Sequence, residues 1–314
     1  MHGHIHAHRP IGGIDRIFDQ VQNSITIRHR RKMKRFSALI SLLAFFLAGC
    51  NPAPPAPATV SDTETTATAS AVPSTSASET RTLTVFAAAS LTNAFTEIGE
   101  RFQIDNPGVF ITFSFAGSQA LRTQIEEGAP ADVFAPANNT EMNALVDTNL
   151  IARDMPQMFL TNKLVVVLPA DNPASITSLE GLANAGIKII LAAEEVPVGK
   201  YTREVLKKMN SQFGSDFGQK VIANVVSNED NVRQVLTKIQ LGEADAGIVY
   251  TSDAVAAPEL QTLDIPLELN IVATYPIAPL AESNQIELAQ AFIAYVLSKD
   301  GQATLQKWGF APPQ

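Results

Sequence analysis

The sequence predicts an α/β protein whose two lobes hold a ligand between them. Apolar, strand-like runs alternate with amphipathic helical stretches along residues 81–314, and four of the strands lead through a short loop directly into a helix. Such alternation is typical of parallel sheets covered by helices. Ligands of these sheets bind beyond the carboxyl ends of the strands, where helix N-termini point inward. Because two of the four junctions lie in the first part of the chain and two in the middle, we expect the ligand between two lobes.

The expected elements follow from apolar runs and from helical periodicity. Strands are predicted at 82–87, 109–115, 132–135, 164–168, 187–191, 221–226, 246–249 and 275–279. Helices are predicted at 91–103, 119–127, 139–147, 200–210, 231–241 and 285–298. The first helix has the clearest pattern, because its apolar residues recur at the spacing of one helix face: Leu91, Ala94, Phe95, Ile98 and Phe102.

The first two junctions each end in a serine, in LTVFAAASL at 83–91 and in ITFSFAGS at 111–118. A serine before an apolar helical stripe is a candidate N-cap, which predicts this role for Ser90 and Ser118. The same turns expose free backbone N–H groups and the positive end of a helix dipole, and together these bind anions. One such serine is usually only a cap, whereas two with the same pattern favour a common ligand.

The other two junctions are IILAAEEVPVG at 189–199 and VVSNEDNV at 225–232. Each leads from a predicted strand into a predicted helix without a serine at the helix start. They repeat the strand, short loop and helix start of the first two junctions.

The composition excludes several kinds of enzyme. All five histidines lie within the first 29 residues, and Cys50 is the only cysteine. If the N-terminal segment is removed on export, the remaining chain has no histidine and no usable thiol. This argues against a Ser-His triad, a cysteine nucleophile, a histidine-based zinc site and a disulfide framework.

The N-terminal segment has the pattern of an export signal. A basic stretch at 30–35 precedes an apolar run at 36–49, which is shorter than the roughly 20 residues of a membrane span. The letters LAG before Cys50 resemble a bacterial lipobox, in which that cysteine is acylated; an ordinary cleavage site beside an unrelated cysteine is the alternative. We predict a signal peptide over 1–49, with a true start near Met33.

The next segment, 50–80, is rich in Pro, Ala, Ser and Thr and is predicted to be a disordered tether.

The charge is distributed unevenly along the chain. Residues 1–49 hold eight Lys/Arg and two Asp/Glu, whereas residues 50–314 hold fifteen Lys/Arg and twenty-nine Asp/Glu, which gives the latter a net charge of −14. Such an acidic body argues against a nucleic-acid partner. An anionic ligand would have to be held by local dipoles and neutral donors.

Several segments together resemble the periplasmic molybdate-binding proteins of ABC importers, a branch of the type II solute-binding fold. They are VFAAASLTNA at 85–94, FAGS at 115–118, GAPADVF at 128–134, VPVG at 196–199, NVR at 231–233, GIVYTSD at 247–253 and GQATLQKWGF at 301–310. Their order and spacing, rather than any single segment, make the resemblance specific.

The resemblance implies that the ligands of a tetrahedral oxyanion are Ser90, Ser118, Val198, Val232 and Tyr250. Each serine would offer a hydroxyl and a backbone N–H, each valine a backbone N–H, and the tyrosine its phenol. Seven neutral donors and no cation suit a fully deprotonated dianion. The family varies by one residue at the fourth loop, so Asn231 is the alternative donor there.

The resemblance also implies a two-lobed protein with lobe I at 81–163 and 276–314 and lobe II at 164–275. The protein would bind molybdate or tungstate, use no cofactor and no free metal cation, and catalyse no reaction. It would deliver the ligand to an ABC permease and its ATPase subunit. We expect a monomer without nucleic acid, held at the extracytoplasmic face of the membrane through the acyl chains on Cys50 alone.

Other functions remain open at this point. Carriers of sulfate, phosphate or ferric ion are rivals, although ferric carriers usually use paired tyrosines, and none is adjacent among Tyr201, Tyr250, Tyr275 and Tyr295. An exported hydrolase could use Ser90 or Ser118 with a carboxylate, although neither serine lies in a Gly-x-Ser-x-Gly or Ser-x-x-Lys motif.

Several candidate residues also have a purely structural interpretation. Tyr250 could equally be a core tyrosine with a satisfied hydroxyl. Arg233 and Lys200 could contact an anion, but solvated residues at a helix start are the commoner case. The acidic residues beside the loops are expected to be solvated or capping rather than metal-binding: Glu194, Glu195, Glu229 and Asp230. The phenylalanines at helical spacing are expected in the core: Phe95, Phe102 and Phe292.

Overall fold

A computed structural model describes residues 80–313 of the chain. The predicted signal peptide, the lipidation site Cys50 and the tether up to residue 79 lie outside the described residues, so they remain predictions. Within 80–313, no helix is both long enough and apolar enough to cross a membrane.

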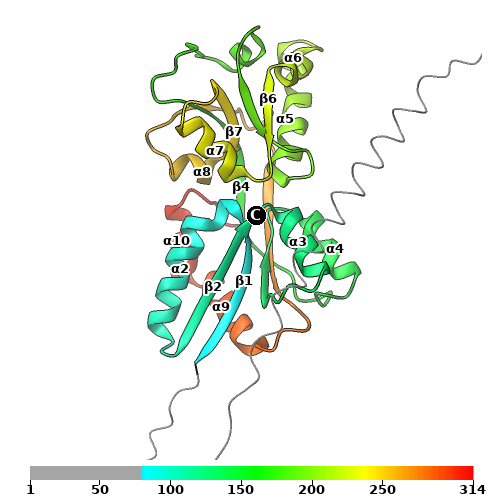
Figure 1. Cartoon of the computed structure of the whole chain (residues 1–314), viewed down its shortest axis with the longest axis vertical. Coiled ribbons are helices and arrows are strands. Elements are labelled where there is room, and N and C mark those ends of the chain that lie inside the picture. Colours follow the sequence, from blue (N-terminus) through cyan, green and yellow to red (C-terminus); the bar gives the residue numbers. More distant parts are fainter. Residues whose placement is uncertain (1–79, 314) are drawn as a thin grey trace, which may run out of the picture. The chain divides into compact units, whose positions relative to one another are not determined.

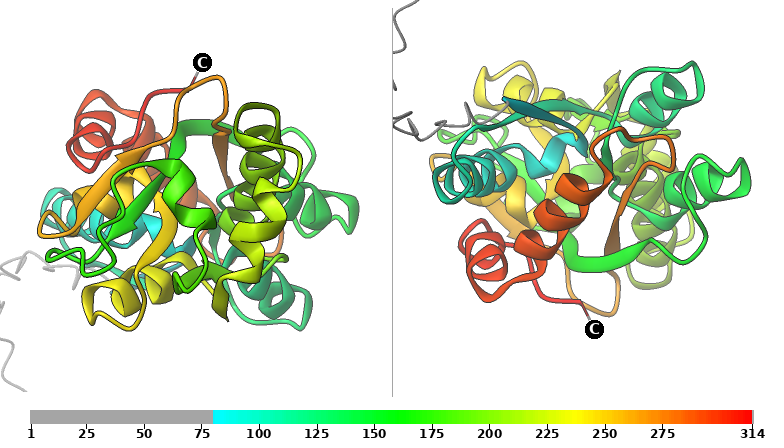
Figure 2. Two further views of the ribbon diagram at one scale, coloured as in Figure 1. Left: turned by 90° about the horizontal axis from the view of Figure 1, so that it is seen from above. Right: turned by 90° about the horizontal axis from the view of Figure 1, so that it is seen from below.

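The first group of strands is parallel, and each strand is followed by a helix. The strands are β1 (Arg81–Ala88), β2 (Val109–Ala116) and β3 (Val133–Ala135). The helical elements after them are η1 (Ala89–Leu91), α2 (Thr92–Asp105), α3 (Ser118–Glu126) and α4 (Asn139–Asp147). Helix α2 lies on one side of these strands, and α3 and α4 lie on the other (Figure 2).

The second group repeats this arrangement with β5 (Ile189–Ala192), β6 (Val225–Glu229) and β7 (Ala246–Tyr250), and it includes β8 (Gln261–Asp264). Its helical elements are η2 (Leu179–Ala183), α5 (Pro197–Phe213), α6 (Phe217–Ala223), α7 (Val232–Gln240) and α8 (Thr251–Val255). Figure 1 shows α5, α6, α7 and α8 around these strands.

Two long antiparallel strands, β4 (Gln157–Leu168) and β9 (Val272–Pro279), connect the groups. The first half of β4 pairs with β9, and its second half pairs with β7 and β8. The end of β9 pairs with β3. The chain then closes with α9 (Ile286–Leu297) and α10 (Lys299–Lys307), which pack near α2. Two groups of strands joined by crossover strands match the predicted two-lobed α/β architecture; the predicted lobe boundaries remain predictions.

Most expected elements are present, and the differences have physical reasons. The predicted strand 221–226 is wrong, because 217–223 forms α6, which buries Phe217 and Val221 one helical turn apart, and β6 begins only at Val225. Strand β4 is longer than predicted, because its buried polar residues Thr161 and Asn162 pair with β9, and a pairing with a distant strand gives no signal in local periodicity.

The predicted serine N-caps are also wrong. Ser90 lies inside the 3₁₀ turn η1, which begins after Ala88, and Ser118 is the first residue of α3 with Gly117 at the N-cap. Neither hydroxyl caps its helix, so both are available for other hydrogen bonds.

The core prediction for the aromatic residues is confirmed. Phe95, Phe102 and Phe292 are at most 3% exposed, and the Phe292 ring meets the other two edge-on, with centroids 6.0 and 5.5 Å away. Aromatic pairs favour this geometry. The contacts fix α2 against α9 and so hold the strand-to-helix junction at Ser90 in place.

Candidate functional site

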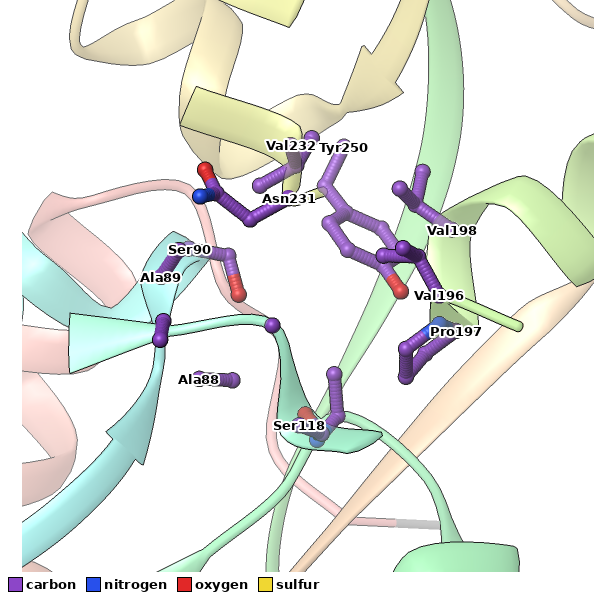
Figure 3. A pocket seen from close by; sticks show the side chains of 13 residues that line it. Ala88, Ala89, Ser90, Ser118, Val196, Pro197, Val198, Asn231, Val232 and Tyr250 are labelled. Atoms are coloured by element: carbon purple, nitrogen blue, oxygen red, sulfur yellow. The ribbon is translucent and has the colours of Figure 1, made fainter. Parts of the chain in front are cut away.

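The four predicted junctions meet at one small pocket (Figure 3). All five residues that the resemblance predicts as ligands line it, and so does the alternative, Asn231: Ser90, Ser118, Val198, Asn231, Val232 and Tyr250. Small residues also line it, including Ala88, Ala116 and Gly117. Small side chains allow a ligand to approach the backbone closely.

Ser90 is 2% exposed and lies in the turn after β1. Its Oγ is 3.0 Å from the phenol oxygen of Tyr275 on β9, and either atom could donate in this hydrogen bond. The turn is stabilised by the Thr92 hydroxyl, which donates to the carbonyl of Ala89. These hydrogen bonds therefore fix the position of Ser90, and its hydroxyl faces the pocket (Figure 3).

Ser118 is 1% exposed, and its Oγ accepts a hydrogen bond of 3.0 Å from the backbone N–H of Ala137. An amide N–H can only donate in such a bond, so the hydroxyl proton of Ser118 remains for another acceptor. As the first residue of α3, Ser118 also has a backbone N–H without an intrahelical acceptor. The residue thus offers two donors.

Backbone groups provide the opposite wall. Val198 is the second residue of α5, after Pro197, and Val232 is the first residue of α7. N–H groups at these positions have no intrahelical acceptor. The side chain of Asn231 caps α7 by accepting from the N–H groups of Arg233 and Gln234. These bonds engage the Asn231 Oδ1 and leave the Val232 N–H at the open end of the helix dipole.

Tyr250 ends β7 and is 1% exposed. Its phenol oxygen is buried without a hydrogen-bond partner among the residues that the structure describes. A core tyrosine usually has a partner for its hydroxyl, so a buried phenol that lines the pocket without one favours the role of a ligand donor. Burial raises the pKa of Tyr250 well above its usual value, which keeps the phenol protonated as a donor. In Figure 3 the hydroxyls of Tyr250 and Ser90 face the same space.

An ion pair lies behind this wall. Arg233 Nε is 2.7 Å from a carboxylate oxygen of Asp253, which is 0% exposed. Burial raises the pKa of Asp253 to about 6, although the Arg233 charge and a hydrogen bond from the Tyr250 N–H oppose this shift. The expectation that Arg233 is a solvated helix-start residue is therefore wrong, whereas Lys200 is exposed as expected.

The acidic residues beside the loops differ in how far they are exposed to solvent. Glu194, Glu195 and Asp230 are exposed, whereas Glu229 is buried and forms a 2.7 Å ion pair with Lys238. Solvation was therefore the wrong expectation for Glu229. Within 80–313, no group of three or more His, Cys, Asp or Glu side chains could hold a metal ion.

The two sides of the pocket touch each other. The side-chain amide of Gln119 donates to the carbonyl of Asp230 at 3.2 Å, and a guanidinium nitrogen of Arg233 lies 3.4 Å from the carbonyl of Ser90. A Cβ atom on Gly117 would overlap the Asp230 carbonyl oxygen. Contacts between the two strand groups therefore lie beside the pocket.

Three residues that support the site were not apparent from the sequence: Ala137, Asp253 and Tyr275. Asp253 was part of the segment GIVYTSD, but nothing marked it as buried. Tyr275 is 185 residues away from Ser90 in the sequence. Only correlated substitutions at positions 90 and 275 across related sequences could have linked Tyr275 to Ser90.

With the geometry established, comparisons with known proteins give the family. A model for bacterial extracellular solute-binding proteins matches residues 83–311. The chain is 40% identical to the molybdate-binding protein of Mycobacterium tuberculosis over 232 residues, which cover 74% of this chain and 85% of that protein. The chain belongs to the bacterial extracellular solute-binding protein family.

Solved structures agree with this assignment. The substrate-binding domain of a putative molybdenum ABC transporter from Clostridium difficile has 30% identity and a TM-score of 0.58, covering 74% of this chain and 99% of that one. A sulfate-binding protein from Mycobacterium tuberculosis has 21% identity and a TM-score of 0.67, covering 74% and 87%, and it shows the shared fold alone. The two-lobed type II fold of solute-binding proteins, predicted from the sequence, is confirmed.

Proposed function

We propose that this protein captures molybdate outside the cytoplasm and delivers it to the permease of an ABC importer. The observation that carries this proposal is a pocket lined by neutral donors, in a chain 40% identical to a molybdate-binding protein. The proposed ligands are the hydroxyls and N–H groups of Ser90 and Ser118, the N–H groups of Val198 and Val232, and the phenol of Tyr250.

The chemistry of the pocket suits a fully deprotonated tetrahedral dianion. Such an ion only accepts hydrogen bonds, and the proposed ligands all donate them. Hydrogen bonds to a charged group contribute about 1.5–3 kcal/mol each, and four helix or turn starts add favourable dipoles. With Tyr250 protonated and Asp253 titrating near pH 6, we expect molybdate affinity to be nearly constant from about pH 7 to 9.

Sulfate is the nearest rival, because it has the same charge and shape with shorter bonds, and the fold is shared with a sulfate-binding protein. A pocket sized for molybdate would leave some hydrogen bonds to sulfate stretched. Phosphate is disfavoured for another reason. At neutral pH it carries a proton, which needs an acceptor, and the proposed ligand set contains only donors.

A ferric carrier is a rival because Tyr250 and Tyr275, which are distant in sequence, pack with ring centroids 5.9 Å apart. The absence of adjacent tyrosines in the sequence therefore does not exclude a tyrosine pair in space. However, burial raises the pKa of both phenols, which opposes the phenolate form that ferric iron needs. The Tyr275 hydroxyl is also engaged with Ser90. These observations favour an anion over a cation.

A serine hydrolase is not supported by the surroundings of either serine. Ser90 Oγ contacts a phenol and Ser118 Oγ accepts from an amide, so neither hydroxyl bonds to a group that could remove its proton. We therefore propose a binding protein without catalytic activity.

We further propose that the protein is attached to the membrane through acylated Cys50, that it is a monomer, and that tungstate is a second ligand.

Calorimetry with purified protein tests the proposal directly. We expect molybdate and tungstate to bind tightly in a one-to-one complex, sulfate to bind more weakly, and phosphate and ferric citrate to give no heat. Thermal unfolding should shift upward in the same order, because a ligand that binds only the folded state stabilises it by mass action. Equal affinities for sulfate and molybdate would contradict the assignment of the ligand, and intact mass without acyl chains would contradict the anchor.

A further inference from the structure

We propose that Arg233 is a positioning residue that latches the two strand groups together around the bound ligand and so sets the rate at which the ligand leaves. The inference rests on the proposed function and deepens it. Arg233 belongs to α7 of the second strand group, and α7 packs against η1 of the first group. Arg233 does not line the pocket, so it acts on the ligand only through other residues.

The guanidinium of Arg233 makes two contacts with two different nitrogens. Nε forms the 2.7 Å ion pair with Asp253, and both residues of this pair belong to the second strand group. Nη2 donates to the backbone carbonyl of Ser90, which belongs to the first group, at 3.4 Å. Separation of the two groups would therefore break the contact with Ser90 and leave the ion pair intact. The ion pair fixes the guanidinium in place for the second contact.

The contact with Ser90 joins two residues that would hold the same ligand from opposite sides. Arg233 directly follows Val232, whose N–H is a proposed donor, and Ser90 is a proposed donor of the other strand group. Just before α7, the carbonyl of Asp230 accepts from the side-chain amide of Gln119 on α3. The start of α7 is thus in contact with both junctions of the first group, and Arg233 supplies the charged contact.

A contact that exists only while the groups are together stabilises the closed form relative to the open one. A charged donor makes a stronger hydrogen bond than a neutral one, but this bond is long and the Arg233 side chain is 23% exposed. We therefore expect its loss to change the kinetics about three- to tenfold rather than a hundredfold. Because the ligand meets the open form and leaves after the groups separate, the change should appear in the dissociation rate.

Arg233→Lys isolates the latch from the ion pair. The planar guanidinium reaches two acceptors at once with separate nitrogens, whereas the lysine ammonium is a single point charge. The ammonium would still neutralise the buried carboxylate of Asp253, which would otherwise be left unpaired at a large cost in stability. It would not reach the carbonyl of Ser90 at the same time. The variant should therefore fold and bind while lacking the contact between the groups.

The test combines calorimetry with the release of radiolabelled molybdate into excess unlabelled molybdate. It is made at pH 8, where Asp253, with a pKa of about 6, is ionised. In Arg233→Lys the dissociation rate and the dissociation constant should both rise about three- to tenfold, the association rate should stay within about twofold, and denaturant unfolding without ligand should stay close to wild type. Arg122→Lys is the matched control. Arg122 also pairs through two nitrogens, but Glu126 and Glu141 both lie in the first group, so release should be unchanged.

The outcomes separate this proposal from the function on which it rests. Wild-type protein that fails to bind molybdate would overturn the proposed function. Wild-type protein that binds molybdate, with a dissociation rate that Arg233→Lys leaves unchanged or a loss of affinity confined to the association rate, would overturn only the latch.

A second variant covers the case in which Arg233→Lys does not fold. The double variant Arg233→Met with Asp253→Asn removes both buried charges, and its asparagine keeps an acceptor for the N–H of Tyr250. It also lacks the contact with Ser90, so it should release molybdate about three- to tenfold faster than wild type. Release at the wild-type rate would contradict the proposal.

Discussion

The two walls of the pocket present donors in different ways. On the wall after β1 and β2, Ser90 and Ser118 present hydroxyls that are oriented by other protein groups. On the wall formed by α5 and α7, Val198 and Val232 present N–H groups while their side chains are buried. Side-chain identity therefore determines the chemistry of the first wall, whereas backbone geometry determines that of the second. Residues on the second wall can change without changing what the pocket offers a ligand.

The largest effect is expected from Ser118→Ala on the first wall. The substitution removes one donor to the ligand, at a cost of about 1.5–3 kcal/mol in molybdate affinity, and leaves the buried Ala137 amide without its acceptor. Calorimetry should show weaker binding, and denaturant unfolding should show lower stability even without ligand. Unchanged molybdate affinity would mean that this wall does not contact the ligand through its hydroxyls.

A smaller effect on affinity is expected from Val198→Pro on the second wall. Proline deletes the N–H, but in the first turn of α5 it breaks no intrahelical hydrogen bond. Molybdate should bind about tenfold more weakly or worse. Val198→Ala is the matched comparison: it shortens a buried side chain but keeps the N–H, so its affinity should lie within about threefold of wild type. Equal losses in both variants would mean that the valine side chain, rather than its N–H, matters.

Gly117→Ala tests the contact between the walls. Its backbone φ of −60° suits any residue, so a form of the protein in which the two strand groups separate without ligand should tolerate alanine. In the closed protein the new Cβ would overlap the Asp230 carbonyl oxygen, and forced overpacking costs about 1–3 kcal/mol. Molybdate affinity should fall while the melting temperature without ligand stays close to wild type. Solution scattering of wild type should show a smaller radius of gyration with molybdate; an unchanged profile would argue against closure.

Asp253→Asn is expected to lower stability, because it leaves Arg233 without its buried ion-pair partner, and to change the dependence of stability on pH. Burial raises the pKa of Asp253 from its usual 3.8 to about 6. Because the folded protein binds this proton more tightly than the unfolded chain, the carboxyl lowers the free energy of unfolding as pH rises from about 4 to 6. The asparagine variant should lack this decline, which denaturant titrations at several pH values would reveal. Parallel pH profiles for the two proteins would contradict the raised pKa.

Much of this architecture was accessible from local patterns. Helical periodicity located α2, and the strand-to-helix junctions located the residues that line the pocket, because a helix start exposes its own N–H groups wherever it folds. The local patterns failed where an element is defined by a distant partner. The boundary between α6 and β6 and the first half of β4 depend on packing against η2 and β9, which local sequence does not encode.

The sequence by itself determined the α/β class, the acidic body without histidine and the four junctions that carry the candidate donors. The tertiary structure alone decided which hydroxyls are oriented and which charges are buried. Tyr275 reaches Ser90 only because β9 crosses back between the strand groups, and Asp253 is buried only because Arg233 and α7 cover it. The physical reason is that helix starts arise from neighbours along the chain, whereas hydrogen-bond direction and desolvation arise from groups brought together across about two hundred residues.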